Sequence, residues 1–421
     1  MTLKQDQKRS FIYLISKIIS AGLSLISISI FTRIFDADTY GSYLLFISYV
    51  ILICSLFFSW HRLSVYRYYH RFKNNYQSYI KTSYLSFTVI IIILAAGAFS
   101  AYLLPIKVEL KILIYFCALA SIFKSNFDLN QSIFNISRSD DIFGLNIIIR
   151  PLLFILFNLF LYYYIKEQEY TLIYSFIFSF LIISIISDFL ILKNSDRGLF
   201  QKEIVNKFAS YGFPLTGFFV FDYILTFSDR LFIGHYLGPD MVGAYGANYD
   251  LTKQMVLFLM IIQGYIIYPE INKSFEKKDY GEVKNLMSFN LNIFITVFFP
   301  LCVFIISFNS IISSVFIGEQ FTELSSKLIP LFSIILFLWG IKIHHLDYIF
   351  QLTEKTKYSM YILFFGSIIN IILNIYLIPK YQLLGASYAT LGSYILILLL
   401  TIIIGNSLMS IKVNFSILLK T

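Results

Sequence analysis

The chain has 421 residues, of which 58% are hydrophobic and 14% are charged, and its formal net charge at pH 7 is +9. Soluble domains contain about 45–50% apolar and about 25% charged residues, so the composition excludes an ordinary soluble protein and indicates an integral membrane protein. The excess of Lys and Arg is typical of cytoplasmic loops of membrane proteins, and because no basic soluble domain is present we expect no nucleic-acid partner.

The N-terminal stretch, residues 1–10, is polar and basic and leads directly into the first apolar run. That run is long enough to span a membrane and has no small-residue cleavage site, so we expect a retained first helix rather than a signal peptide. Cys54, Cys117 and Cys302 each lie inside an apolar run. We expect them to be buried free thiols, without disulfides or a bound metal.

A helix needs about 20 mostly apolar residues to cross a bilayer, and twelve segments of the chain meet this requirement. In chain order the predicted spans are 11–32, 42–60, 83–104, 109–127, 142–164, 171–192, 208–229, 243–268, 286–308, 327–349, 358–378 and 384–405. The connections are short. We therefore predict an all-α integral membrane protein with twelve transmembrane helices.

Most Lys and Arg residues outside these spans fall on the side of the membrane that holds both termini. Cytoplasmic loops carry the excess of positive charge, so we expect both termini in the cytoplasm. One basic stretch, HRLSVYRYYHRFKNNYQSYIK at 61–81, alternates cations with aromatic residues. This pattern is typical of an interfacial helix on anionic lipid; the alternative is a surface that gathers the phosphate of a lipid substrate.

An internal repeat relates the region after the first span to the region after the seventh. The first copy reads TRIFDADTYGSY from Thr32, and the second reads DRLFIGHYLGPDMVGAYG from Asp229. The matched residues are Arg33 with Arg230, Phe35 with Phe232, Asp38 with Asp240, Gly41 with Gly243 and Tyr43 with Tyr245. Six spans in each half make the halves parallel, and transporters commonly place a cavity between two such halves.

We therefore expect two parallel-repeat, six-helix lobes around a central cavity. The expected divisions are an N-terminal lobe at 1–192, a cytoplasmic linker at 193–207 and a C-terminal lobe at 208–421.

Ionisable side chains inside a span are costly and usually face a cavity or a partner. The cations more than three residues from either end of a predicted span are Lys17, Arg150, Lys253 and Lys342. Lys17 is expected to line the cavity, because serines at helical spacing continue its face. Ion pairs within the protein are the simpler interpretation of Asp250 with Lys253 and of Asp229 with Arg230, and interfacial placement is the simpler one for Arg150.

Asp222, on the seventh span, is also expected to line the cavity. In the tenth span, Lys342 lies three residues before His345, and His344 lies three residues before Asp347. This short cluster lacks further ligands for a metal, so a proton-responsive pair or a plain helix-end cluster is the better interpretation.

Enzyme signatures are weak. The acidic tripeptide at 36–38 is similar to a glycosyltransferase motif, but it is short and Asp38 already belongs to the repeat. The chain has no P-loop, no HExxH and no GxSxG sequence. We therefore expect no enzyme, no cofactor and no direct use of ATP.

Three stretches in register resemble the bacterial O-antigen and capsular polysaccharide flippases of the multidrug/oligosaccharidyl-lipid/polysaccharide exporter superfamily. RIFDADTYGSYLLF resembles the family's entry into the second helix, and SDRLFIGHYLGPDMVGAYGANYDL resembles its junction of helices seven and eight. NIILNIYLIPKYQLLGASYAT, from Asn370, resembles the junction of helices eleven and twelve. The chain departs from the family at Gln382, where glycine is common, and at Ser387, where alanine is common.

In this last stretch we expect Pro379–Lys380 to form a tight external turn. The small residues Gly385, Ala386 and Ala389 should let helices approach closely. Asn370 and Asn374 should form hydrogen bonds across helices.

The resemblance implies a flippase that moves undecaprenyl-pyrophosphate-linked oligosaccharides to the outer leaflet of the bacterial cytoplasmic membrane by alternating access, for O-antigen or other surface polysaccharides. The cation Lys17 would hold the pyrophosphate, because a point charge suits phosphate. The further candidate cations are Arg150, Lys253 and Lys342. The candidates for coupling to a proton or sodium gradient are Asp222, His344 and Asp347. The motif residues expected to be structural or to lie between the lobes are Arg33, Asp229, Arg230, Asn370 and Asn374.

Membrane lipid, a polysaccharide polymerase and assembly proteins would be the partners of such a flippase. A cation-coupled small-molecule or drug antiporter of the same superfamily is the main alternative. A major-facilitator sugar transporter also has twelve spans, but its loop signatures are absent here, and a membrane glycosyltransferase or polymerase would change the products themselves.

Overall fold

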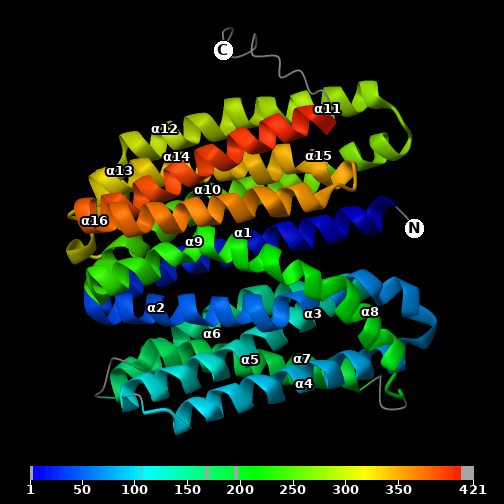
Figure 1. The fold of residues 1–421 in the computed structure, drawn as a ribbon, viewed down its shortest axis with the longest axis horizontal. Coiled ribbons are helices and arrows are strands. Elements are labelled where there is room, and N and C mark those ends of the chain that lie inside the picture. The colour runs from blue at the N-terminus through cyan, green and yellow to red at the C-terminus, as the bar shows by residue number, and fades with distance from the viewer. Residues whose placement is uncertain (1–2, 106, 166–169, 194–197, 409–421) are drawn as a thin grey trace. The chain divides into compact units, whose positions relative to one another are not determined.

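The computed structural model describes residues 3–105, 107–165, 170–193 and 198–408, and within these residues the fold is made of helices (Figure 1). The predicted all-α membrane fold is confirmed. The twelve predicted spans each correspond to a long helix or to consecutive helical segments. Among the described residues, eight helical runs are long and apolar enough to cross a membrane, and two of these runs each cover two predicted spans.

The chain forms two compact units, the first made of residues up to Leu23 and Tyr43–Tyr223, the second made of Ser24–Ser42 and the residues from Ile224 onward. Helices α1 (Leu3–Ile34), α2 (Ala37–Ile53) and α9 (Thr216–Tyr236) each begin in one unit and end in the other. The tip of the α1–α2 hairpin thus packs with the C-terminal half of the chain.

The remaining helices of the first unit follow in chain order. They are η1 (Cys54–Phe58), α3 (Ser59–Tyr68), η2 (Tyr69–Asn75), α4 (Tyr76–Leu103), α5 (Val108–Ser137), α6 (Asp140–Tyr164), α7 (Thr171–Leu192), α8 (Lys202–Gly212) and η4 (Phe213–Leu215). Their core is built of aliphatic and aromatic side chains, including Phe87, Leu129 and Ile133, that are removed from solvent.

The remaining helices of the second unit are α10 (Pro239–Glu276), α11 (Tyr280–Ile293), η5 (Phe294–Phe298), α12 (Phe299–Ser307), α13 (Asn309–Phe316), η6 (Glu319–Phe321), α14 (Ser325–Ile341), η7 (Lys342–Leu346), α15 (Asp347–Leu352) and α16 (Thr356–Leu408). The segments η1, η5 and η7 are single π-helical turns within longer helical runs. A π-turn inserts one residue into a helix and changes which side chains share a face.

Within the second unit the two copies of the sequence repeat pack against each other through their glycines. A Cβ atom on Gly41 would lie 1.7 Å from the carbonyl oxygen of Pro239, and one on Gly243 would lie 2.3 Å from the carbonyl oxygen of Ala37. Pro239 and Ala37 occupy matching positions of the two copies, so the contact is reciprocal. The first turns of α2 and α10 therefore cross at a distance that only glycine allows.

Hydrogen bonds hold the same hairpin tip on the second unit. The Gly318 amide donates to the Thr32 hydroxyl at 3.0 Å, and Gln320 Nε2 donates to the carbonyl of Phe35 at 2.7 Å. Arg33 Nη2 donates to the carbonyl of Val315 at 2.7 Å. The predicted motif residue Arg33 thus ties the end of α1 to α13.

Gly41→Ala should destabilise the fold by about 1–3 kcal/mol or more, because the new methyl group meets backbone that cannot rotate away. Gly97→Ala is the matched control, since a Cβ there has nothing within 4 Å, and alanine should favour helix α4 by about 1 kcal/mol. Thermal unfolding of the purified protein in detergent measures both effects. Equal midpoints for the two variants would contradict the close crossing.

The turn inside α16 lies at Gln382, with φ 52° and ψ −130°, and not at Pro379–Lys380, where the sequence analysis placed it. Pro379 lies inside the helix, so the chain reverses three residues later. A positive φ with this ψ is a conformation that glycine adopts readily and other residues adopt only under strain. The departure from the family pattern at Gln382 therefore falls on the one residue of α16 with non-helical backbone angles.

Gln382→Gly should stabilise the protein by about 1 kcal/mol, because the strain it relieves, about 1–3 kcal/mol, exceeds the entropic cost of glycine. Gln77→Gly, at an exposed helical position of α4, should instead destabilise the protein by about 0.5–1 kcal/mol. The two unfolding midpoints should shift in opposite directions. A loss of stability in both variants would show that the turn at Gln382 carries no strain.

Candidate functional site

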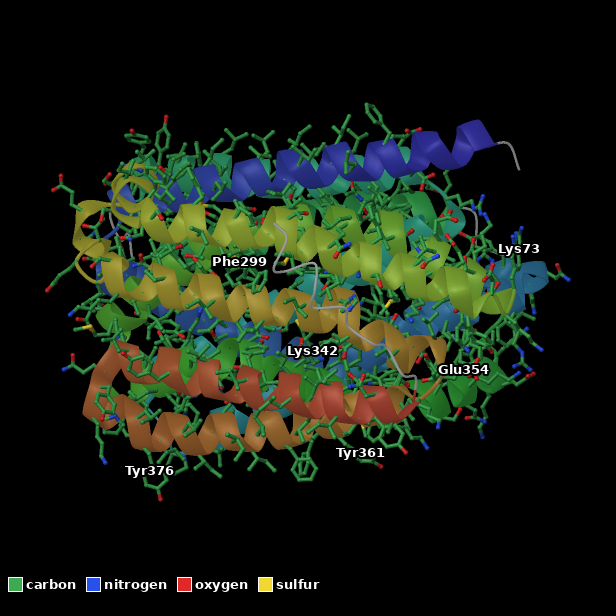
Figure 2. All side chains as sticks on the ribbon, turned by 90° about the horizontal axis from the view of Figure 1, so that it is seen from above. Lys73, Phe299, Lys342, Glu354, Tyr361 and Tyr376 are labelled. Carbon is green, nitrogen blue, oxygen red and sulfur yellow. The ribbon has the colours of Figure 1, made fainter. Side chains whose placement is uncertain are left out.

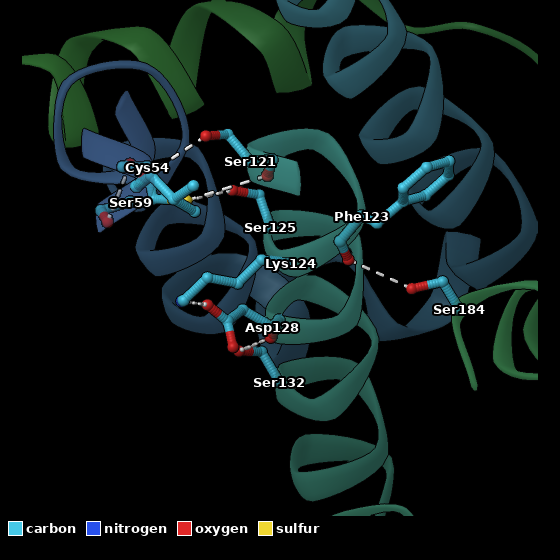
Figure 3. A network of polar contacts seen from close by, with 10 residues as sticks. Cys54, Ser59, Ser121, Phe123, Lys124, Ser125, Asp128, Ser132 and Ser184 are labelled. Atoms are coloured by element: carbon cyan, nitrogen blue, oxygen red, sulfur yellow. Dashed lines mark hydrogen bonds and ion pairs between the residues drawn. The ribbon is translucent and has the colours of Figure 1, made fainter. Parts of the chain in front are cut away.

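The carboxylate of Asp128, on α5 in the first unit, interacts with four cations. Lys124 Nζ lies 2.8 Å from Asp128 Oδ2, one helical turn away on the same helix (Figure 3). The Asp128 carboxylate also interacts electrostatically with Arg62 on α3, Arg150 on α6 and Lys17 on α1. One negative charge does not neutralise four positive ones, so this cluster, which we call the Asp128 cluster, retains net positive charge.

Arg150 lies on an aromatic surface rather than directly on a carboxylate. Its guanidinium carbon is 5.7 Å from the ring centroids of Phe154 and Phe176 and 4.5 Å from that of Phe180. Its Nε is buried and has no hydrogen-bond partner. Cation–π contacts of this kind hold the guanidinium in place.

Lys17 is half-buried on α1, and its ammonium lies 5.6 Å from the ring of Tyr13. Sequence reasoning identified Lys17 and Arg150 but missed Arg62, Lys124 and Asp128. The predicted fourth span ended at residue 127, whereas α5 continues to Ser137 and takes the Lys124–Asp128 pair into the helix. The spacing of four residues was the signal that could have found this pair.

The two other predicted cavity cations belong to the second unit. Lys253 lies 5.4 Å from the ring of Phe227 and 5.6 Å from that of Tyr249. Arg230 contacts the same two rings and forms an ion pair with Asp250, at 2.6 Å between Nη2 and Oδ1. The expected Asp229–Arg230 pair is therefore wrong, because adjacent helical residues point about 100° apart and each finds a different neighbour.

Lys342 forms a buried ion pair with Asp347, at 2.7 Å between Nζ and Oδ2. The residues are five apart, and they meet because η7 is a π-turn; Figure 2 labels Lys342 on this run. The sequence analysis instead grouped Lys342 with His345 and His344 with Asp347, using the α-helical period. A candidate cation and a candidate coupling carboxylate thus neutralise each other.

The two histidines beside this pair face other helices. Asn290 Nδ2 on α11 donates to the carbonyl of His344 at 2.7 Å and lies 3.2 Å from His345 Nδ1. The ring of His344 lies edge-on to Trp339 at 6.1 Å. Among the described residues, no group of three or more His, Cys, Asp or Glu side chains is placed to hold a metal ion.

Asp229 is the centre of a buried polar cluster that joins α9, α10 and both halves of α16. Its carboxylate accepts hydrogen bonds from the Tyr245 hydroxyl at 2.9 Å, from Asn374 Nδ2 at 2.8 Å and from the Thr390 hydroxyl. Asn374 Nδ2 also donates to Asn370 Oδ1 at 3.1 Å. These residues, which we call the Asp229 cluster, are all at least nine-tenths buried.

The donors to Asp229 are all neutral, and Asn374 Oδ1 is buried without a hydrogen-bond partner. The predicted structural residues Asp229, Asn370 and Asn374 are thus brought into one bonded group. Sequence reasoning did not predict that Tyr245 and Thr390 bind Asp229, because they lie 16 and 161 residues from it in the chain. The remaining coupling candidate, Asp222, is half-buried on α9 within the first unit.

Comparisons of the sequence with known proteins give a family match and a membrane-protein relative. A sequence model described as polysaccharide biosynthesis protein matches residues 107–326. An uncharacterised membrane protein of Methanocaldococcus jannaschii is 22% identical over 276 residues, which are 62% of this chain and 53% of the relative. The chain thus matches about half the length of that relative.

Three solved structures share the fold. The lipid II flippase MurJ, in an inward closed conformation, is 18% identical with a TM-score of 0.73, covering 92% of this chain and 86% of that one. An inward-facing multidrug resistance MATE family transporter of the MOP superfamily is 12% identical with a TM-score of 0.68, covering 94% and 95%. A MOP superfamily transporter from Pyrococcus furiosus is 14% identical with a TM-score of 0.62, covering 95% and 96%.

Proposed function

The chain belongs to the polysaccharide biosynthesis protein family, and from this premise we propose that it is a flippase for undecaprenyl-pyrophosphate-linked oligosaccharides. It moves them across the cytoplasmic membrane of a bacterium by alternating access, for O-antigen or another surface polysaccharide. It acts as a transporter and not as an enzyme. The fold it shares with a lipid II flippase supports a lipid-linked cargo.

The Asp128 cluster is the observation that carries this proposal. A pyrophosphate bears several negative charges and needs cations that are fixed in place and not fully neutralised. Lys17 supplies a point charge, and Arg150 supplies planar N–H donors held by the rings of Phe154, Phe176 and Phe180. Binding of the anion stabilises the cluster further, because the excess positive charge then gains a counter-charge in a medium of low dielectric constant.

Two cations of the second unit fit this role less well. Arg230 and Lys342 already have carboxylate partners at 2.6 and 2.7 Å. Removing a partner from a buried pair leaves an uncompensated charge, so these pairs resist release to a substrate. We propose that they hold the second unit together, whereas the first unit binds the pyrophosphate.

We further propose that an ion gradient drives the cycle and that Asp229 binds the coupling proton or sodium ion. The carboxylate is deeply buried and held by neutral donors, and the oxygens of Tyr245, Thr390, Asn370 and Asn374 lie in the same cluster. Buried carboxylates of this kind commonly serve proton relays and ion sites in transporters. Asp222 and His344 remain the alternatives, whereas the third candidate, Asp347, is neutralised by Lys342.

A strain without its own O-unit or capsule flippase, supplied with this gene and the neighbouring glycosyltransferases, should regain surface polysaccharide. Lys17→Ala should reduce the restored polysaccharide at least tenfold, because the site loses a charge that contacts the pyrophosphate, while Lys17→Arg should retain most of it. Lys327→Ala, an exposed cation outside the cluster, is the control. Gel analysis of the extracted polysaccharide measures all four strains.

Normal polysaccharide with Lys17→Ala would refute the role of Lys17 in binding the pyrophosphate. Failure of the unmodified protein, when the lipid-linked unit is made and the protein is present in the membrane, would favour the antiporter alternative.

Asp229→Asn should abolish the stimulation of transport by an imposed sodium or pH gradient while leaving the protein folded. The change removes the titratable, cation-binding group but keeps the size of the side chain. Asp240→Asn, at an exposed position of the same unit, is the control. Transport of an undecaprenyl-pyrophosphate-linked probe in proteoliposomes gives the readout, and full gradient dependence in the Asp229 variant would place the coupling ion elsewhere.

A further inference from the structure

Helix α8, between the two halves of the sequence, is fixed on the helices of the first unit. Ile204 and Phe208 are fully buried on its inner face, and the ring of Phe208 lies 5.6 Å from that of Tyr79. The Ser64 hydroxyl on α3 donates to the carbonyl of Phe208 at 2.9 Å. The expected linker at 193–207 therefore ends in a docked helix.

The residues before α8 are also held in place. The Leu199 amide donates to the Ser78 hydroxyl at 3.1 Å, and the Gln201 amide donates to the Thr82 hydroxyl at 3.0 Å. Residues 198–215 and 59–81 thus form one continuous surface, which we call the α3–α8 platform.

The platform carries a large excess of positive charge. Its sequence contains seven Lys and Arg residues and one carboxylate, that of Glu203. Glu203 is bound by Lys207 on the same helix. The platform cations with exposed side chains are Arg67, Arg71, Lys73 and Lys202; Figure 2 labels Lys73.

Aromatic rings position two of the platform cations. Lys207 Nζ lies 5.0 Å from the ring of Phe72, and the Arg67 guanidinium carbon lies 5.8 Å from the ring of Tyr211. Large apolar side chains are exposed beside them, including Phe213 at 67% and Leu199 at 74%. Exposed apolar groups next to exposed cations suit the boundary between acyl chains and headgroups.

We propose that the α3–α8 platform binds the headgroups of anionic phospholipids. The cations contact the phosphates, while the exposed apolar side chains enter the adjoining acyl region. Charge complementarity selects an anionic over a zwitterionic headgroup. Because α8 precedes α9, which runs into the second unit, the bound lipid fixes the connection between the two halves of the sequence against the first unit.

The test compares short-chain phosphatidylglycerol with short-chain phosphatidylcholine, titrated into the purified full chain in detergent. The triple variant Arg71→Gln, Lys73→Gln, Lys202→Gln should bind phosphatidylglycerol about a hundredfold more weakly, since each removed cation weakens binding about fivefold. The unmodified protein should lose affinity as salt rises. The unfolding midpoint of the variant in phosphatidylcholine verifies that it is folded.

The matched control is Lys277→Gln, Lys278→Gln, Lys284→Gln, three exposed cations of the second unit among the carboxylates Glu276, Asp279 and Glu282. It should change phosphatidylglycerol affinity less than threefold. An equal loss in both triple variants would show a general effect of net charge and refute the platform. Undecaprenyl pyrophosphate that binds the platform while phosphatidylglycerol does not would also refute it, in favour of a substrate-gathering surface. These outcomes do not depend on flippase activity.

Discussion

A charged side chain inside a bilayer has no water to solvate it, so it needs a partner within the protein. This constraint determines how the polar groups of this fold are arranged. In the second unit the constraint is met almost completely: Arg230 pairs with Asp250, Lys342 pairs with Asp347, and Asp229 accepts hydrogen bonds from Tyr245, Asn374 and Thr390. In the first unit the constraint is not met, because the single carboxylate of Asp128 interacts with several cations. The Asp128 cluster therefore suits the proposed pyrophosphate site, and the Asp229 cluster suits the proposed site of the coupling ion.

The proposed function depends on these two clusters. A pyrophosphate needs uncompensated positive charge, and the aromatic rings around Arg150 provide it without a carboxylate in direct contact. An ion gradient needs a protonatable or cation-binding group, and the Asp229 carboxylate is deeply buried and held by neutral donors. Its cluster joins α9 and α10 to both halves of α16, so a change in the charge of Asp229 would affect several helices at once. The sequence repeat that crosses at Gly41 and Gly243 lies in the same unit as Asp229.

Hydrophobicity and charge were enough to predict the spans, because a bilayer imposes the same length on every helix that crosses it. Contacts between particular side chains were harder to predict from the sequence. Lys342 meets Asp347 only because of the π-turn at η7, and no periodic pattern in the sequence predicts such a turn. Tyr245 and Thr390 reach Asp229 across long separations in the chain. The turn lies at Gln382 and not at the predicted Pro379–Lys380, because the residues that follow Pro379 stay helical as far as Gln382.

The account rests on movement of a lipid-linked sugar across a bilayer, and reconstitution tests that claim most directly. Purified protein in liposomes would be supplied with an undecaprenyl-pyrophosphate-linked oligosaccharide in both leaflets, and a sugar-modifying reagent that cannot cross the membrane would be added outside. We predict that nearly all of the sugar becomes modified over time. Lys17→Ala should slow the modification of the sugar that starts in the inner leaflet. Modification that stops at the share present in the outer leaflet, with protein correctly inserted, would contradict the account.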